Sequence, residues 1–168
     1  MLTFIRPDER HRQDVLAFYA EFEETGGTCI GYGGWQDYDK WLQGMLNRHT
    51  GHDLPESSIR EDFYLCYEGD ALIGVFSLKF ELTPFLLNYG GHIGYAVRPS
   101  QQRRGLATEI LKEGVALARS SGFKRLLLVC DDDNLASEKV ILKNGGQYEN
   151  TLFDPDEQVF VKRYWIDC

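Results

Sequence analysis

The sequence predicts a single α/β domain built on a mixed sheet, and three observations support this prediction. The chain has 168 residues, which is long enough for one domain with a sizeable core and short for two. Strand-like runs alternate with segments in which apolar residues recur every three or four positions. No internal repeat, linker or low-complexity tract divides the chain. We therefore expect one domain over residues 1–168.

The first half of the chain is expected to contain a strand, two helices and a hairpin. A short strand, "LTFIR", ends at Pro7 and precedes a helix whose apolar stripe begins at Val15. The glycines between Thr25 and Trp35 predict a loop, and a second helix follows over "QDYDKWLQGMLNRH". After a further loop, "TGHDLPESS", two runs of strand formers flank "EGD" and predict a hairpin over "DFYLCYEGDALIGVFSLKFEL".

The second half is expected to alternate strands and helices. A strand, "HIGYAVRP", is closed by Pro99, and the helix "GLATEILKEGVALARSSG" stops at Gly122. The almost wholly apolar "KRLLLVC" is typical of a strand buried on both faces. A second helix lies in "DDDNLASEKVILKNGG", with Asp133 or Asn134 as its cap, and "EQVFVKRYWI" is a final strand. The expected order is β-α-α-β-β-β-α-β-α-β.

Charge and composition exclude several classes of protein. The net charge of −8 argues against a nucleic-acid binder, because phosphate neutralisation requires a basic face. No apolar run approaches about 18 residues, and the N-terminus does not resemble a signal peptide, so we expect no membrane partner. The four cysteines lack CxxC spacing, which favours free thiols in a cytoplasmic protein: Cys29, Cys66, Cys130 and Cys168.

Three further patterns are weak indicators of function. His49, His52 and Asp53 lie in an expected loop without further ligands in register, so we expect no metal site. The acidic run 131–133 precedes a helix, where capping and the helix dipole account for it. Four aromatic residues fit either a pocket or core packing: Tyr32, Trp35, Tyr38 and Trp41.

The most informative stretch is "GHIGYAVRPSQQRRGLATEILKEG", in which Arg103 and Arg104 directly precede Gly105 at the expected start of a helix. A helix N-terminus offers unpaired N–H groups and a positive dipole end, which suit a phosphate. Glycine permits close approach of a ligand to the backbone. The alternative to a phosphate site is that Gly105 only permits a tight turn of the backbone and that the two arginines are solvated.

The hexad Gln102-Arg103-Arg104-Gly105-Leu106-Ala107 resembles the Q/R-x-x-G-x-G/A signature of the GNAT superfamily of acyl-CoA-dependent N-acetyltransferases. "HIGYAVRP" is similar to the fourth strand of that family, and "NLASEKVILKNGG" to its later helix. The resemblance is specific over residues 91–146, the expected acyl-CoA-binding core. Residues 1–90 agree only in element order and would form the variable acceptor side, and 147–168 would hold the C-terminal strands. The family fold is a mostly antiparallel twisted sheet flanked by helices, with its fourth and fifth strands splayed apart.

The resemblance implies acetyl-CoA as the acyl donor and no metal. Backbone groups of Ala96, Val97 and Arg98 would face the pantetheine arm, and Asn134 would reach the cofactor nearby. The arginine side chains would support the pyrophosphate site. The pyrophosphate itself would be wrapped by backbone N–H groups of Gln102, Arg103, Arg104, Gly105, Leu106, Ala107 and Thr108.

Catalysis of acetyl transfer requires a base for the amine, an oxyanion donor and an acid for the thiolate. The N–H near Val97 would be the oxyanion donor. His92 is the candidate base, with Glu81 in reserve, although His92 could equally have a structural role. Many relatives carry Tyr at the position of Val140, and this sequence departs from that pattern. It resembles instead the ribosomal-protein N-terminal acetyltransferase type, and that resemblance implies Ser137 as the acid. Ser137 could instead cap its helix. A distant alternative for the acid is Tyr148.

The sequence therefore predicts an N-acetyltransferase that moves acetyl from acetyl-CoA to a primary amine by direct attack in a ternary complex. The alternative is an acyl-CoA-binding or sensing protein that keeps the fold without turnover, and the absence of Tyr at Val140 gives this alternative some weight. The acceptor would be a small-molecule or peptide amine, and its identity stays open. A homodimer is compatible with the resemblance, because dimers are common in the family.

Overall fold

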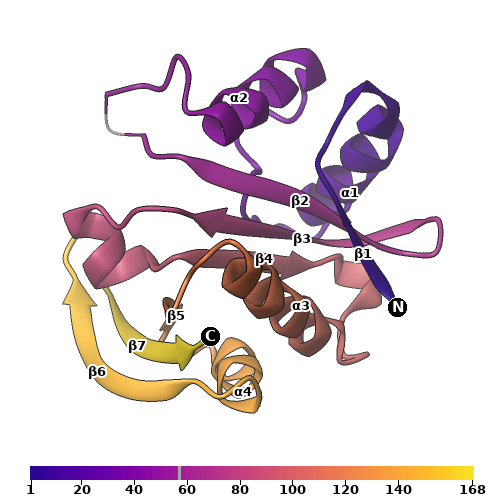
Figure 1. Ribbon diagram of the computed structural model, residues 1–168. Coiled ribbons are helices and arrows are strands. Elements are labelled where there is room, and N and C mark those ends of the chain that lie inside the picture. The colour runs from indigo at the N-terminus through magenta and orange to yellow at the C-terminus, as the bar shows by residue number, and fades with distance from the viewer. Residues whose placement is uncertain (57) are drawn as a thin grey trace.

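A computed structural model describes residues 1–56 and 58–168 of the chain. Figure 1 shows the helices and strands along the chain. Their bounds are β1 (Leu2–Ile5), α1 (Arg12–Glu24), α2 (Tyr38–Thr50), β2 (Glu61–Glu68), β3 (Ala71–Lys79), β4 (Ile93–Val97), α3 (Leu106–Ser120), β5 (Arg125–Asp131), α4 (Leu135–Lys143), β6 (Gln147–Asp154) and β7 (Val159–Asp167). Short helical turns are η1 (Glu9–His11), η2 (Leu86–Gly90) and η3 (Pro99–Gln101). The loop expected over 50–58 includes residue 57, which lies outside the described residues.

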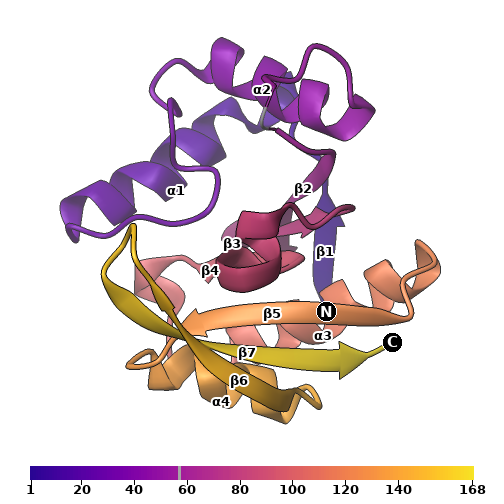
Figure 2. The same cartoon turned by 90° about the vertical axis from the view of Figure 1, so that its left-hand side faces the viewer.

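The strands form two antiparallel sheets rather than one continuous sheet. The first has the order β1-β2-β3-β4 and the second has the order β5-β7-β6. Figure 2 faces the second sheet, in which β7 lies between its two neighbours. The two sheets meet between β4 and β5, where the N–H of His92 donates to the carbonyl of Leu127 at 2.8 Å. The expected mixed fold, with antiparallel sheets flanked by helices, is confirmed.

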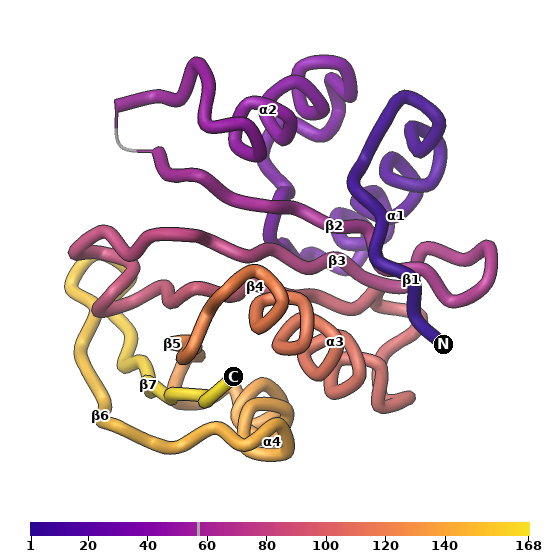
Figure 3. Tube along the Cα trace, viewed as in Figure 1, coloured from indigo at the N-terminus to yellow at the C-terminus, as the bar shows by residue number. Residues whose placement is uncertain are grey.

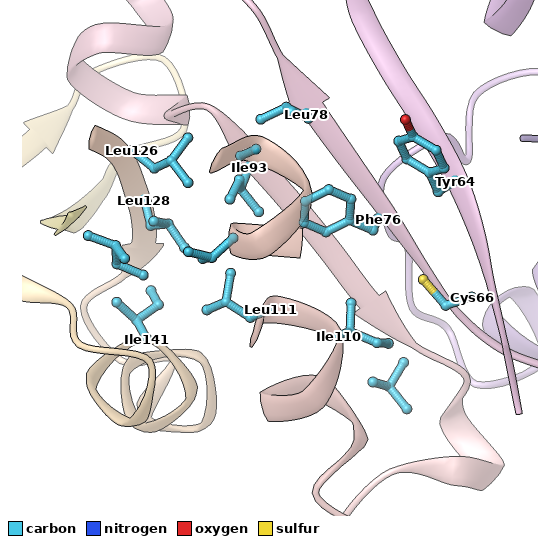
Figure 4. Packing of buried hydrophobic residues seen from close by; sticks show 14 of the residues in the cluster. Tyr64, Cys66, Phe76, Leu78, Ile93, Ile110, Leu111, Leu126, Leu128 and Ile141 are labelled. Atoms are coloured by element: carbon cyan, nitrogen blue, oxygen red, sulfur yellow. The ribbon is translucent and has the colours of Figure 1, made fainter. Parts of the chain in front are cut away.

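Helices cover the two faces of the first sheet. Figure 3 shows α1 and α2 on one side of β2 and β3, and α3 and α4 on the other. The cluster under α3 and α4 contains Phe76, Ile110 and Leu128 among others (Figure 4). The cluster under α1 and α2 contains Trp35, Tyr38 and Trp41, each at most 7% exposed, with Tyr32 partly buried against it. Of the two interpretations of these aromatic residues, core packing is confirmed.

The order of elements read along the sequence ended in a single strand, although the resemblance placed C-terminal strands in residues 147–168; the strand missing from that order is β6. Its sequence, "QYENTLFD", has no clean alternation of apolar and polar residues. A bulge between Tyr148 and Asn150 shifts the pairing with β7 and breaks the two-residue period along the strand. The strand forms because β7 pairs with it over its length, with Phe153 opposite Phe160. A pattern in the sequence cannot reveal a strand whose partner imposes it.

We predict opposite effects of alanine at two helical glycines. A Cβ on Gly114 of α3 would overlap the ring of Phe76, whereas a Cβ on Gly44 of α2 would meet nothing within 4 Å. Gly44→Ala should raise the free energy of unfolding by about 0.5–1 kcal/mol through helix propensity. Gly114→Ala should lower it by about 1–3 kcal/mol, because overpacking outweighs propensity. Urea unfolding of both variants measures the difference, and stabilisation by both would contradict the packing described.

Candidate active site

A cleft of about 640 Å³ lies between β4, the first turns of α3 and α4, and the loop that follows α1. Most of the residues that the sequence predicted for cofactor binding line it, together with the candidate acid Ser137. Phe22 and the loop after α1 form another part of the wall. The predicted residues in the lining are Ala96, Val97, Gln102, Arg103, Gly105, Leu106, Ala107, Thr108 and Asn134.

The start of α3 presents a row of free backbone N–H groups. Gly105 is the N-cap residue, with a φ of 82°, and Arg103 also has a positive φ of 61°. Within residues 1–56 and 58–168, no oxygen accepts a hydrogen bond from the N–H groups of residues 103–107. Left-handed residues so close together turn successive N–H groups toward one side, which together with the helix dipole favours an anion. This geometry suits a phosphate or pyrophosphate.

Two of the predicted cofactor residues use their side chains elsewhere. Arg98 donates from Nε to Glu21 at 2.5 Å, and its backbone N–H donates to the carbonyl of Ile73 in β3 at 2.8 Å. Arg104 pairs with Glu68 at 2.9 Å and also bonds Gln101. Neither residue lines the cleft. Backbone groups of Arg98 were expected to face the pantetheine arm, but the N–H of Arg98 is not available for that contact, because β3 takes this donor.

The backbone of β4 has one bonded edge and one open edge. His92 and Arg98 both bond β3, and in an antiparallel pair the residues that bond the partner strand alternate. Ala96 therefore directs its backbone toward β3, while Tyr95 and Val97 direct theirs toward the seam with β5. Of the predicted backbone contacts, Val97 is the one on the edge away from β3, where its carbonyl accepts from Nε2 of Gln102 at 3.4 Å.

A pair of hydroxyl groups lies in the cleft on the side of α4. The Tyr95 hydroxyl and Ser137 Oγ are 2.9 Å apart, and Asn134 caps α4 by accepting from the N–H of Ser137 at 3.0 Å. Burial raises the pKa of Tyr95 to about 12, so this hydroxyl keeps its proton at neutral pH. Sequence reasoning missed Tyr95. Its position two residues from both Ile93 and Val97 on a strand was the available signal.

His92 lies outside the lining of the cleft, at the closed end of the seam. Its side chain is 8% exposed, and Nδ1 accepts from the N–H of Leu127 at 2.9 Å. A neutral imidazole has one acceptor nitrogen, so the remaining Nε2 carries the proton here. This arrangement favours the structural role over the base, and the base assignment stays a prediction.

The reserve candidates also lie away from the cleft lining. Glu81 is an exposed residue that follows the end of β3. Tyr148 is 58% exposed, and its hydroxyl bonds Thr151. Among the described residues, neither side chain hydrogen-bonds Tyr95 or Ser137.

The described residues can also be compared with the expectations about a membrane span, a metal site and free thiols. None of its helices has the length and apolar character needed to cross a bilayer. Over the same residues, no three His, Cys, Asp or Glu side chains are grouped so as to hold a metal ion. All four cysteines have free thiols.

The comparison with protein families agrees with this geometry. The model of the acetyltransferase (GNAT) family matches residues 34–145, which is more than half of the chain. The chain belongs to the GNAT family of acetyltransferases.

Individual relatives refine the comparison. A ribosomal-protein-serine acetyltransferase from Escherichia coli (strain K12) is 32% identical over 90 residues, covering 53% of this chain and 49% of the relative. The chain thus matches about half the length of this curated relative. A ribosomal L7/L12 alpha-N-protein acetyltransferase in complex with coenzyme A has a TM-score of 0.74 at 20% identity, covering 99% of this chain and 93% of the other. A microcin C7 self immunity acetyltransferase in complex with acetyl-CoA and AMP has a TM-score of 0.73 at 16% identity, covering 99% and 92%. At these identities the two structures support the fold alone.

We predict that His92 makes stability depend on pH. Burial, with a contribution from the charge of Lys79, lowers the pKa of His92 below its usual value of 6.5. The unfolded chain therefore takes up a proton below about pH 6.5 that the folded protein resists, so unfolding becomes easier as the pH falls. His92→Asn keeps an acceptor for Leu127 and cannot titrate. Urea unfolding at pH 7.5 and 5.5 should show a smaller loss for the variant than for the wild type.

The same variant separates the two roles of His92. If its role is structural, His92→Asn should retain turnover, whereas His92→Ala, which leaves the Leu127 N–H without its acceptor, should unfold more easily. Loss of turnover in a stable His92→Asn protein would instead establish His92 as the base.

Proposed function

We propose that this protein is an N-acetyltransferase that transfers the acetyl group of acetyl-CoA to a primary amine in a ternary complex. The observation that carries the proposal is the row of free N–H groups at residues 103–107, which borders a cleft large enough for an extended ligand. Membership of the GNAT family supports it. Relatives whose structures contain coenzyme A or acetyl-CoA share the fold.

The donor would bind mainly through the backbone. The N–H groups of residues 103–107 would hold the pyrophosphate, with Arg103 adding positive charge beside it. The open edge of β4 at Val97 would pair with the amides of the pantetheine arm, and Asn134 would lie beside that arm. Recognition of this kind needs little from the side chains of Arg98 and Arg104, which bind carboxylates of the chain itself.

Acetyl-CoA would supply an acetyl group activated as a thioester. The acceptor amine must be neutral to attack, and an amine with a pKa near 10.4 is neutral in only about one molecule in two thousand at pH 7. A base must therefore act directly or through water, and His92 stays the predicted group. The N–H of Val97 would stabilise the developing oxyanion. As the C–N bond forms and the C–S bond breaks, Ser137 would give its proton to the sulfur, oriented by Tyr95.

The acceptor is proposed to be a peptide or a small molecule that carries a primary amine. The names of the relatives favour testing peptide N-termini first, since two of them act on ribosomal proteins. We propose a cytoplasmic location and no nucleic-acid partner, consistent with the net charge of −8. The alternative function is acyl-CoA binding without turnover.

The test of donor binding is a calorimetric titration with acetyl-CoA. We call the free N–H groups of residues 103–107 the cradle. Gly105→Glu places a carboxylate there and strains the backbone, because φ of Gly105 is 82°, and it should weaken the binding of acetyl-CoA at least roughly tenfold. Gly122→Glu is the matched control, because Gly122 has a φ of 93° and open space around it at the far end of α3. Absence of binding by folded wild-type protein would refute the proposal, and binding without thiol release from any amine would support the alternative.

We predict a selective loss of turnover when the hydroxyl pair is altered. Ser137→Ala should lower kcat by about 10²-fold while the dissociation constant for acetyl-CoA stays near the wild-type value. Tyr95→Phe should have a smaller effect, because it removes only the partner that orients Ser137. Steady-state kinetics with thiol detection measures both, and Ser120→Ala on the exposed face of α3 is the control. Unchanged kcat in Ser137→Ala would refute the role as acid. The alternative of a cap is already excluded, because the side chain of Asn134 caps α4 and the Ser137 hydroxyl bonds Tyr95.

A further inference from the structure

Glu21 makes two hydrogen bonds that link α1 to the loop before the anion-binding cradle. Its Oε2 accepts from Nε of Arg98, and its Oε1 accepts from the backbone N–H of Ser100, each at 2.5 Å. The side chains of Glu21 and Arg98 are 19% and 26% exposed, so the ion pair is largely shielded from solvent. Together the two bonds, which we call the Glu21 bracket, attach the start of the loop over residues 98–102 to α1.

Among the described residues, few other hydrogen bonds or ion pairs from outside the loop restrain this segment; one of them is from Nε2 of Gln102 to the carbonyl of Val97 at 3.4 Å. Two backbone bonds within η3 close on the loop itself, from Gln101 to Arg98 and from Gln102 to Pro99. Toward β3, the N–H of Arg98 bonds Ile73. The pair of Arg104 with Glu68 is 48% and 41% exposed, and ion pairs at such exposure contribute little. Glu21 is therefore the shielded polar anchor of this loop on the side of α1.

The charge of Glu21 has no direct use in binding an anion. A carboxylate near the free N–H groups of residues 103–107 would by itself repel a phosphate. Bonds from Arg98 and Ser100 outweigh the effect of burial and lower the pKa of Glu21, so it stays ionised at neutral pH. The negative charge of Glu21 beside a site for an anion is explained if the role of Glu21 is to hold the backbone of the loop at Arg98 and Ser100.

Glu21 also connects the two walls of the cleft. The next residue of α1, Phe22, lines the cleft, and the loop after α1 continues that wall. The bracketed loop leads into the opposite wall at Gln102 and Arg103. The two bonds of Glu21 thus set the distance between the wall built by α1 and the wall that carries the cradle.

We propose that Glu21 is a positioning residue for the pyrophosphate of the donor. It acts through Arg98 and the backbone of Ser100, which keep the N–H groups of residues 103–107 directed into the cleft. The inference rests on the proposed function, because it assumes that the cradle binds the pyrophosphate of acetyl-CoA.

The experiment measures two ligands on two variants. Glu21→Gln removes the charge with little change of shape, and Glu24→Gln makes the same change at an exposed site on the same helix. The ligands are acetyl-CoA, titrated by calorimetry, and S-acetylpantetheine, which lacks the pyrophosphate and is followed by ligand-observed NMR. Thermal unfolding of each variant checks that it is folded.

We expect Glu21→Gln to raise the dissociation constant for acetyl-CoA roughly ten- to hundredfold, as loss of a charge-assisted hydrogen bond would. Its affinity for S-acetylpantetheine should stay equal to that of the wild type, and Glu24→Gln should match the wild type for both ligands. Unchanged or tighter binding of acetyl-CoA, or equal losses for both ligands, would overturn the positioning role while leaving the function intact. Failure of the wild type to bind acetyl-CoA would remove the proposed function and this inference with it.

Discussion

The separation of β4 from β5 is the constraint on which the other features depend. Strand pairing ends at this seam, and the two sheets are joined at its closed end by the bonds between His92 and Leu127. Buried backbone groups require hydrogen-bond partners, and among the described residues no second strand pairs with this edge of β4; at Val97 only the carbonyl is met, by the side chain of Gln102. The cleft lies along this edge. A ligand with its own amides is the natural partner for it.

The cradle at the start of α3 also consists of backbone groups that require hydrogen-bond partners. Its N–H groups are free because a helix cannot bond its own first turn, and the positive φ values of Arg103 and Gly105 turn them to one side. Main-chain groups thus provide both sets of donors. Such recognition depends on the conformation of the backbone. This explains why a glycine directly before the start of a helix is the feature of the sequence that identifies the site.

The sequence was sufficient to locate the cradle, because "QRRGLA" encodes the local turn and helix start that create it. It was insufficient wherever a residue takes its role from a distant partner. Arg98 meets Glu21 across 77 positions, and Tyr95 meets Ser137 across 42. The strand β6 was missed for a related reason, because its bulge removes the period while pairing with β7 retains the strand. Local chemistry was predictable, whereas the contacts that redirect side chains were not.

The two hydrophobic clusters on opposite faces of the first sheet have a consequence for how the protein can change. One cluster packs the first sheet against α1 and α2, and the other packs it against α3 and α4. Substitutions that share no partner contribute additively to stability. Residues packed under α1 and α2 can therefore change without repacking the core under α3 and α4. The sheet thus separates the packing of one half of the fold from that of the other.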